Sequence, residues 1–125
     1  MELHESGEMY LETILILKNK FGYVRSIDIA NQMGVSKPSV SRAVGLLKDN
    51  GYISFDPNGM ILLTDSGKTV ADKIYERHTV LTKYFTSIGV SEEVASRDAC
   101  KIEHIISDET FNIIKKRLSD LAQTV

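Results

Sequence analysis

Three strong metal-ligand types stand close together in the second half of the chain. Cys100, Glu103 and His104 offer a thiolate, a carboxylate and an imidazole at positions i, i+3 and i+4. If this segment is helical, the three side chains share one face, because residues three and four apart are neighbours on a helix surface. Sulfur and nitrogen donors suit a divalent transition metal better than calcium or magnesium. The pattern therefore predicts part of a metal site.

An apolar stripe accompanies these ligand types. Ala95, Ala99, Ile102 and Ile106 repeat at i, i+4, i+7 and i+11, which predicts a helix that packs against a core. A buried free cysteine often serves only as a small apolar residue. Adjacent Glu and His residues are also common on solvated helix faces. Taken alone, this segment leaves metal binding and plain packing open.

Three further residues could add ligands. His78 is the polar member of a near-heptad apolar seam in a long helix, between Ile74 and Leu81. Met9 and Glu12, three residues apart, share part of the surface of the first predicted helix. Each has a simpler explanation by itself: a hydrogen-bonded core histidine, a packing methionine and a surface carboxylate. Spacing alone does not assign them to a site.

The first half of the chain predicts a helix-turn-helix. A first helix covers residues 8–21, and Gly22 follows it as a C-cap. Ser26 is the predicted N-cap of a short second helix over residues 27–33, and a third helix begins near Ser36. Two short helices joined by a tight turn, the second opening with hydroxyl and basic residues, are typical of DNA-binding proteins.

The third helix carries the candidate DNA-binding surface. Its N-terminal amides and dipole favour a phosphate, and its outward side chains can reach base edges in the major groove. Residues 18–50 hold six basic and two acidic side chains, a local charge of +4 in a chain of net charge −2. The alternative is a solvated basic face on an ordinary surface helix. The candidate DNA-binding residues are Arg25, Ser36, Lys37, Pro38, Ser39, Ser41, Arg42 and Lys48.

A β-hairpin is predicted directly after this helix. Residues 52–55 and 60–63 read as two short strands, and the Asp-Pro-Asn-Gly segment at 56–59 reads as the turn between them. A hairpin in this place makes the helix-turn-helix winged.

Three amphipathic helices follow the hairpin. A long helix covers about 64–89, and Ser91 and Ser107 open the next two. Their apolar surface exceeds what so small a unit can bury alone, so a homodimer through the C-terminal helices is expected. The predicted fold is mainly α: a winged helix-turn-helix domain at 1–63, then an all-helical dimerisation and metal-binding domain at 64–125.

Composition narrows the class of protein. One cysteine cannot form an internal disulfide, which fits a reducing cytoplasm. The acidic start and the absence of a long apolar run predict no signal peptide and no membrane partner. Cys100 and His104 stand on successive turns without an oxyanion-type glycine loop, so a nucleophilic enzyme is not expected. We expect a cytoplasmic protein that is no enzyme and has no organic cofactor.

Several motifs together resemble a known family. The segment 8–12 (Glu-Met-Tyr-Leu-Glu), the pair Arg77-His78 and above all the block 98–109 are similar to the metal-dependent repressors of the diphtheria-toxin-repressor type, which include manganese-sensing relatives. The similarity covers nearly the whole chain and is most specific around Cys100. It implies a transcription repressor with Fe(II) or Mn(II) as corepressor and a double-stranded DNA operator as partner. It also implies a short form without the SH3-like third domain of longer members.

The resemblance implies a ligand set. The positions that match the main site of the iron branch are Met9, Cys100, Glu103 and His104. Glu12 and His78 match ligands of the manganese branch, and His78 also matches an accessory ligand of the iron branch.

The chain differs from both branches at some ligand positions, and these differences affect which metal ion is favoured. Thr82 and Ser96 stand where the iron branch has further accessory ligands, and neither is a strong ligand. Met9 and Cys100 replace carboxylates of the manganese branch. Exchanging hard oxygen for soft sulfur favours Fe(II) over Mn(II). Zn(II), Co(II) or Ni(II) could bind in vitro, and one metal per subunit is expected.

The implied ligands come from both halves of the chain. A metal held by Met9 and by Cys100 would tie the DNA-binding domain to the dimerisation domain, and so fix two recognition helices at a spacing of about 34 Å. The expected function is a divalent-metal-dependent repressor of metal-uptake or metal-homeostasis genes. The alternative is a metal-independent winged-helix regulator that responds to an organic ligand, with Cys100 and His104 as packing residues.

Overall fold

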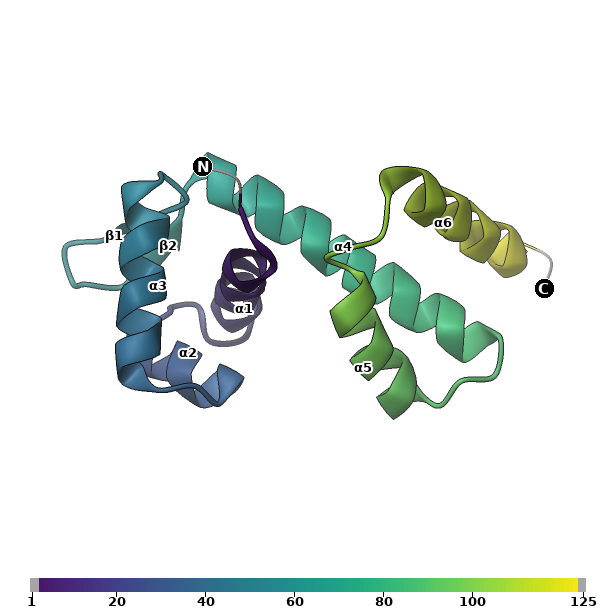
Figure 1. Ribbon diagram of the computed structural model, residues 1–125, viewed down its shortest axis with the longest axis horizontal. Helices are drawn as coiled ribbons and strands as arrows, with labels where there is room; N and C mark the ends of the chain where they lie inside the picture. The colour runs from purple at the N-terminus through teal and green to yellow at the C-terminus, as the bar shows by residue number, and fades with distance from the viewer. Residues whose placement is uncertain (1–2, 124–125) are drawn as a thin grey trace. The chain divides into compact units, whose positions relative to one another are not determined.

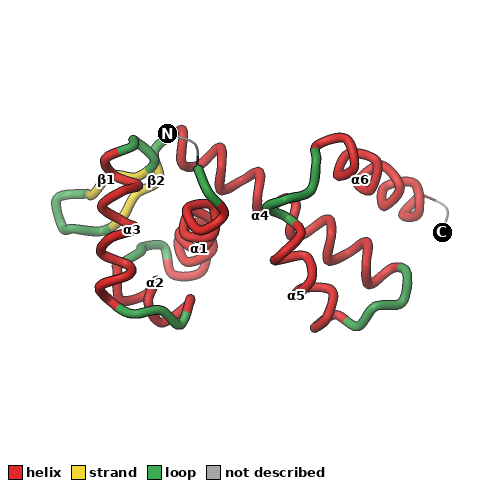
Figure 2. Tube along the Cα trace, viewed as in Figure 1, coloured by secondary structure: helices red, strands yellow, loops and turns green. Residues whose placement is uncertain are grey.

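The computed structural model describes residues 3–123; the first two and the last two residues, which the predicted domains include, lie outside the described range. Within that range the chain forms helices and one pair of short antiparallel strands (Figure 1), and Figure 2 shows the loops that join them. In chain order they are α1 (Glu5–Phe21), α2 (Ser26–Met33), α3 (Lys37–Asp49), β1 (Ile53–Phe55), β2 (Ile61–Leu63), α4 (Asp65–Ser87), α5 (Glu92–Ile102) and α6 (Asp108–Gln123). A winged helix-turn-helix followed by a helical part confirms the predicted fold.

The chain divides into two compact units, Met1–Asp72 and Lys73–Val125. The first turns of α4 belong to the first unit and the rest of the helix to the second. The functional boundary after residue 63 stays a prediction. Among residues 3–123, no helix is both long enough and apolar enough to cross a membrane.

One apolar core holds the first unit together. Leu11, Ile14 and Leu17 of α1 are almost fully buried, and their spacing places them on one face of the helix. They pack with buried residues of α2, α3 and both strands. Gly22 ends α1 in the left-handed conformation, with φ of 82°, as expected of a helix C-cap.

The N-termini of α2 and α3 are fixed by side chains. At α3, the Ser36 hydroxyl accepts a hydrogen bond from the Ser39 backbone N–H at 3.2 Å, which confirms the predicted cap. The predicted cap of α2 was wrong by one residue, since the helix already begins at Ser26 and Arg25 is its N-cap. The reason is that the Asp28 carboxylate accepts from the Arg25 backbone N–H at 3.0 Å.

The predicted wing is confirmed. The strands pair antiparallel, with Ile53 opposite Leu63 and Phe55 opposite Ile61. Asp56 closes the turn, because its carboxylate accepts hydrogen bonds from two backbone N–H groups of the loop. The hairpin is also tied to the core through a 2.8 Å hydrogen bond from the Ile61 N–H to the Val24 carbonyl.

The junction between the wing and α4 is closely packed. Thr64 caps α4, since its hydroxyl accepts from the Gly67 N–H at 3.2 Å and donates to the Gly51 carbonyl at 2.6 Å. A Cβ atom on Gly67 would lie 2.0 Å from the Tyr52 carbonyl oxygen. Glycine is therefore required where α4 leaves the wing.

The second unit has its own small core. Leu81 of α4, Ala99 of α5 and Phe111 of α6 are buried together. Ala95 is also fully buried and Ile102 packs on this core, so the predicted inward face is confirmed as far as the helix runs; Ile106 packs there too but lies beyond the end of α5. Sequence order and packing thus bring the end of α5 against α4, which is where the predicted ligands of this unit lie.

Candidate metal centre and nucleic-acid interface

A buried carboxylate lies between two imidazoles in the second unit. Glu103 is fully buried, and its Oε2 lies 2.9 Å from Nδ1 of His78 on α4. Its other oxygen, Oε1, lies 3.4 Å from Nε2 of His104, whose side chain is also fully buried. Residues that are 25 positions apart in the chain are thereby brought to one point.

The predicted ligand segment crosses a helix end. Cys100 lies in the last turn of α5, whereas Glu103 is the C-cap and His104 lies in the following turn. The Glu103 N–H still donates to the Ala99 carbonyl at 2.9 Å, so Cys100 and Glu103 keep helical spacing. The expectation of one continuous helical face was thus wrong for His104.

The donor set fits a divalent transition metal. Within the described residues, Oε1 of Glu103 is buried and accepts no hydrogen bond. A buried polar atom without a partner costs about 1–3 kcal/mol, and more when it is charged. A cation held by this oxygen and a neighbouring imidazole would remove that cost, and carboxylate with imidazole is a common donor pair for such metals.

Two hydroxyl residues lie beside His78. The Ser96 hydroxyl oxygen is 3.4 Å from Nε2 of His78, and the Thr82 hydroxyl donates to the His78 carbonyl at 2.7 Å. The Ser96 hydroxyl thus lies beside the imidazole, whereas the Thr82 hydroxyl bonds the backbone of His78.

Met9 and Glu12 belong to α1 in the first unit. They are one turn apart, with Glu12 buried and Met9 half-buried. Their membership of the metal site stays a prediction.

Arg77 was missed as a site residue by reasoning from spacing. Its side chain is buried and bonds the chain just after α5. The available signal was its place between Ile74 and Leu81 in the apolar seam of α4, where a surface arginine would not be expected.

Three of the predicted DNA-binding residues lie together at the N-terminal end of α3. The Ser36 hydroxyl donates to the Ser39 hydroxyl at 2.8 Å, and the Arg42 guanidinium lies 3.5 Å from the same oxygen. Lys37 and Lys48 are exposed near the two ends of the helix. Ser41 and Pro38 are exposed as well.

Arg25 differs from the other predicted DNA contacts. Its guanidinium pairs with the Asp28 carboxylate through two bonds of 3.0 Å. This hydrogen bonding, together with the opposite charge, raises the pKa of Arg25. The same hydrogen bonding lowers the pKa of Asp28 despite partial burial. The charge of Arg25 is thus already paired with that of Asp28 within the chain.

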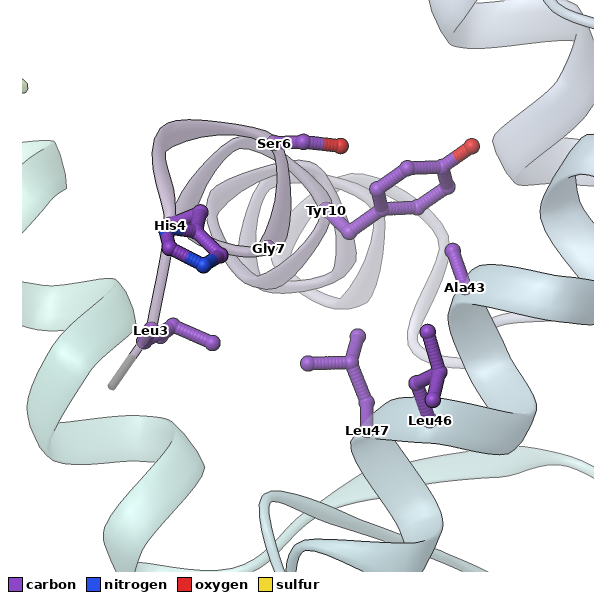
Figure 3. A pocket seen from close by; sticks show the side chains of 8 residues that line it. All are labelled: Leu3, His4, Ser6, Gly7, Tyr10, Ala43, Leu46 and Leu47. Atoms are coloured by element: carbon purple, nitrogen blue, oxygen red, sulfur yellow. The ribbon is translucent and has the colours of Figure 1, made fainter. Parts of the chain in front are cut away.

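A small apolar hollow lies between α1 and α3 (Figure 3). Its volume is about 140 Å³, below the ~300–1,000 Å³ of common small-molecule sites. Its lining residues are Leu3, His4, Ser6, Gly7, Tyr10, Ala43, Leu46 and Leu47. None of them belongs to the predicted sites.

Two family models cover almost the whole chain. Residues 2–60 match the N-terminal DNA binding domain of the iron dependent repressor, and residues 64–124 match its metal binding and dimerisation domain. The chain is also 35% identical to transcriptional regulator MntR of Escherichia coli O6:H1, over 85% of this chain and 68% of that protein. It is 36% identical to HTH-type transcriptional regulator MntR of Geobacillus kaustophilus, over 94% and 81%.

Solved structures agree with the sequence matches. A manganese-dependent transcriptional repressor in complex with manganese is 25% identical with a TM-score of 0.82, covering 90% of this chain and 52% of that one. The IdeR protein of T. acidophilum is 26% identical with a TM-score of 0.79, covering 95% and 55%. The chain thus spans about half the length of these two solved regulators.

These matches favour a metal-dependent regulator over the alternative that responds to an organic ligand. The family consists of transcriptional regulators, so the protein is not an enzyme. With the winged helix, the buried Glu103 centre and both domain matches in agreement, the chain belongs to the iron-dependent repressor family and is a metal-dependent transcriptional regulator.

Proposed function

We propose that the protein represses metal-uptake or metal-homeostasis genes as a homodimer on a double-stranded DNA operator, with a divalent metal as corepressor. The observation that carries the proposal is the buried Glu103 carboxylate between His78 and His104. A buried carboxylate oxygen without a hydrogen bond destabilises the fold, and a bound cation would offset that cost. Carboxylate and imidazole groups are also suitable ligands for such a cation. Action at an operator puts the protein in the cytoplasm under this proposal.

The proposed main ligands are Met9, Cys100, Glu103 and His104. Glu12 and His78 are proposed as further ligands, either to the same ion or to a second one. Support comes from the donor types and from the short distances around Glu103. We propose one metal per subunit as the minimum.

Fe(II) is the proposed metal, with Mn(II) next. The thiolate of Cys100 and the thioether of Met9 are softer donors than a carboxylate, which favours Fe(II) over Mn(II). Relatives that are named as manganese regulators keep Mn(II) as the second candidate. Zn(II), Co(II) and Ni(II) are proposed to bind in vitro only.

The proposed DNA contacts are the α3 residues and their flanks. Ser36, Ser39 and Arg42 form a hydrogen-bonded set at the N-terminal end of α3, where a helix favours phosphate or a base edge. The remaining proposed contacts are Arg25, Lys37, Pro38, Ser41 and Lys48.

The proposed dimer uses the C-terminal helices. Large apolar side chains are exposed there: Ile88 by 61%, Ile113 by 57% and Leu121 by 47%. Large exposed apolar side chains are enriched at subunit interfaces. A dimer would present two copies of α3 to half-sites about 34 Å apart.

Operator selection tests the proposal. Duplexes from a random pool would be captured by protein that was purified without oxygen and loaded with Fe(II) or Mn(II), and the selection would be repeated after chelation. We expect a two-fold symmetric sequence only with metal, lost in Cys100→Ala and His104→Ala. Enrichment of the same sequence by fully chelated protein would contradict the corepressor role.

A further inference from the structure

Arg77 is a charged side chain that the second unit buries beside the candidate metal centre. It is 6% exposed and directly precedes His78 on α4. Arginine is rarely buried unless it is paired, and here both terminal nitrogens are paired, while the buried Nε has no hydrogen-bond partner among the described residues. The hydrogen-bond partners of Arg77 therefore indicate its structural role.

The guanidinium bonds the segment that joins α5 to α6. One nitrogen, Nη1, donates to the Glu103 carbonyl at 3.2 Å and to the Ile106 carbonyl at 2.7 Å. The other, Nη2, pairs with the Asp108 carboxylate. The guanidinium carbon also lies 5.4 Å from the centre of the Phe111 ring.

These bonds answer a specific need of the backbone. The last carbonyls of a helix have no partner within the helix, and α5 ends at Ile102. Arg77 donates to the carbonyl of Glu103, the C-cap of α5, and to that of Ile106, which lies beyond the turn that follows. The turn that carries Glu103 and His104 is thereby fixed to the helix that carries His78.

Two physical effects of Arg77 on a bound metal have opposite signs. As a nearby cation it repels a divalent ion, so its charge alone would weaken metal binding. As the anchor of the turn it keeps the Glu103 carboxylate and the His104 imidazole in place before the metal arrives, which strengthens binding. If Arg77 is replaced by a neutral residue, a rise in metal affinity indicates that repulsion dominates, and a fall indicates that anchoring of the turn dominates.

We propose that Arg77 is a positioning residue of the metal centre, one that raises metal affinity by holding the turn of Glu103 and His104 against α4. The inference rests on the proposed function of that centre. Its closest analogy in general metal chemistry is the outer group that orients a ligand, whose loss typically costs about 10–100-fold in affinity.

The experiment compares metal affinity in full-length variants by competition with a chromophoric chelator, using Mn(II) and Co(II). Arg77→Met keeps an apolar stem without charge, and we expect affinity to fall about 10–100-fold. Arg77→Lys keeps the charge but not the fork and is expected to recover part of the loss. The visible spectrum of the Co(II) protein should change in Arg77→Met, because the ligand geometry is altered.

Two further variants, Asp108→Asn and Lys73→Ala, change exposed side chains and are therefore less prone to misfold than a substitution of buried Arg77. Asp108 is 72% exposed, so Asp108→Asn should fold while removing the partner of Nη2, and we expect a smaller loss of affinity. Lys73 also approaches Asp108, at 3.6 Å. Lys73→Ala is the matched control and should bind metal as the wild type does.

The outcomes are distinct. Equal or tighter binding by Arg77→Met or by Asp108→Asn, with the wild type binding metal, would overturn the positioning role and leave the proposed function intact. An equal loss in Lys73→Ala would also overturn it, because removing a cation should not weaken metal binding through charge and the loss would then not depend on the bonds of Arg77 to the turn. A wild type that binds neither ion would overturn both.

Discussion

His78 of α4 and Glu103, the C-cap of α5, are in contact, with Nδ1 of the imidazole 2.9 Å from Oε2 of the carboxylate. The contact is made inside the second unit, and the carboxylate is fully buried. Since the other carboxylate oxygen faces His104 at 3.4 Å, one acidic group lies between two imidazoles.

Glu103→Gln should remove most of the metal affinity. The change keeps the shape of the side chain but removes the charge that faces the cation, and loss of a ligand should exceed the ~10–100-fold cost of losing an outer group. Isothermal titration with Mn(II) measures the effect. Glu109→Gln, an exposed position in the first turn of α6, is the control and should have no effect. Undiminished binding by Glu103→Gln would remove this residue from the site.

Cys100→Ser should alter metal preference more than total binding. Replacing the thiolate with a hydroxyl removes the softest donor, so affinity for Fe(II) or Zn(II) should fall more than affinity for Mn(II). Competition titrations under anaerobic conditions would give the ratio of the affinities. A parallel loss for all three ions would argue that Cys100 serves packing only.

Arg42→Ala should weaken DNA binding and its dependence on salt. If the guanidinium neutralises one phosphate, the slope of log affinity against log salt should become shallower by about 1. Fluorescence anisotropy on a selected duplex at several salt concentrations gives the slope. Lys115→Ala is the control, because Lys115 pairs with Glu76 on the surface of the second unit. An unchanged slope would exclude a phosphate contact at Arg42.

The Arg25–Asp28 pair predicts a pH effect on stability. The pKa of Asp28 is lowered from its ordinary value of 3.8 by the guanidinium, so the pair stabilises the fold above that value and the contribution is lost as the pH falls through the lowered pKa. Arg25→Gln should therefore melt at a lower temperature than the wild type at pH 7. The difference should vanish in acid, as followed by circular dichroism. A constant difference at all pH values would mean that the charge pair is not responsible.

Gly67→Ala should lower the free energy of unfolding, whereas Gly45→Ala should raise it. A Cβ at Gly67 would lie 2.0 Å from a backbone carbonyl, so the wing junction must shift, at a cost of about 1–3 kcal/mol or more. A Cβ at Gly45 in α3 meets nothing within 4 Å, and alanine there should stabilise the helix by about 0.5–1 kcal/mol. Chemical denaturation measures both changes. Equal effects would contradict the close packing at the junction.

Much of the fold was predictable because local signals agreed. Ser36 ahead of Pro38, and the Asp-Pro-Asn-Gly turn at 56–59, each specify a helix start or a hairpin within a few residues. The end of α5 was not predictable in this way, since it depends on Arg77, which comes from another helix to bond the Glu103 carbonyl.

The candidate site was predictable in residue type but not in geometry. Spacing indicated that Cys100 and Glu103 share a face, and they do keep helical spacing. That His78 would contact Glu103 follows from the packing of α4 against α5, which no local pattern encodes. The burial of Arg77 has the same origin.

The most direct test measures operator affinity by anisotropy with the wild type and Glu103→Gln, each chelated and each loaded with Fe(II) or Mn(II). A coupling of about 1–3 kcal/mol corresponds to roughly 5–150-fold. We predict that metal raises the operator affinity of the wild type within that range. The operator affinity of Glu103→Gln should be the same with and without metal. Equal affinity of chelated and loaded wild-type protein would contradict metal-dependent control through this centre.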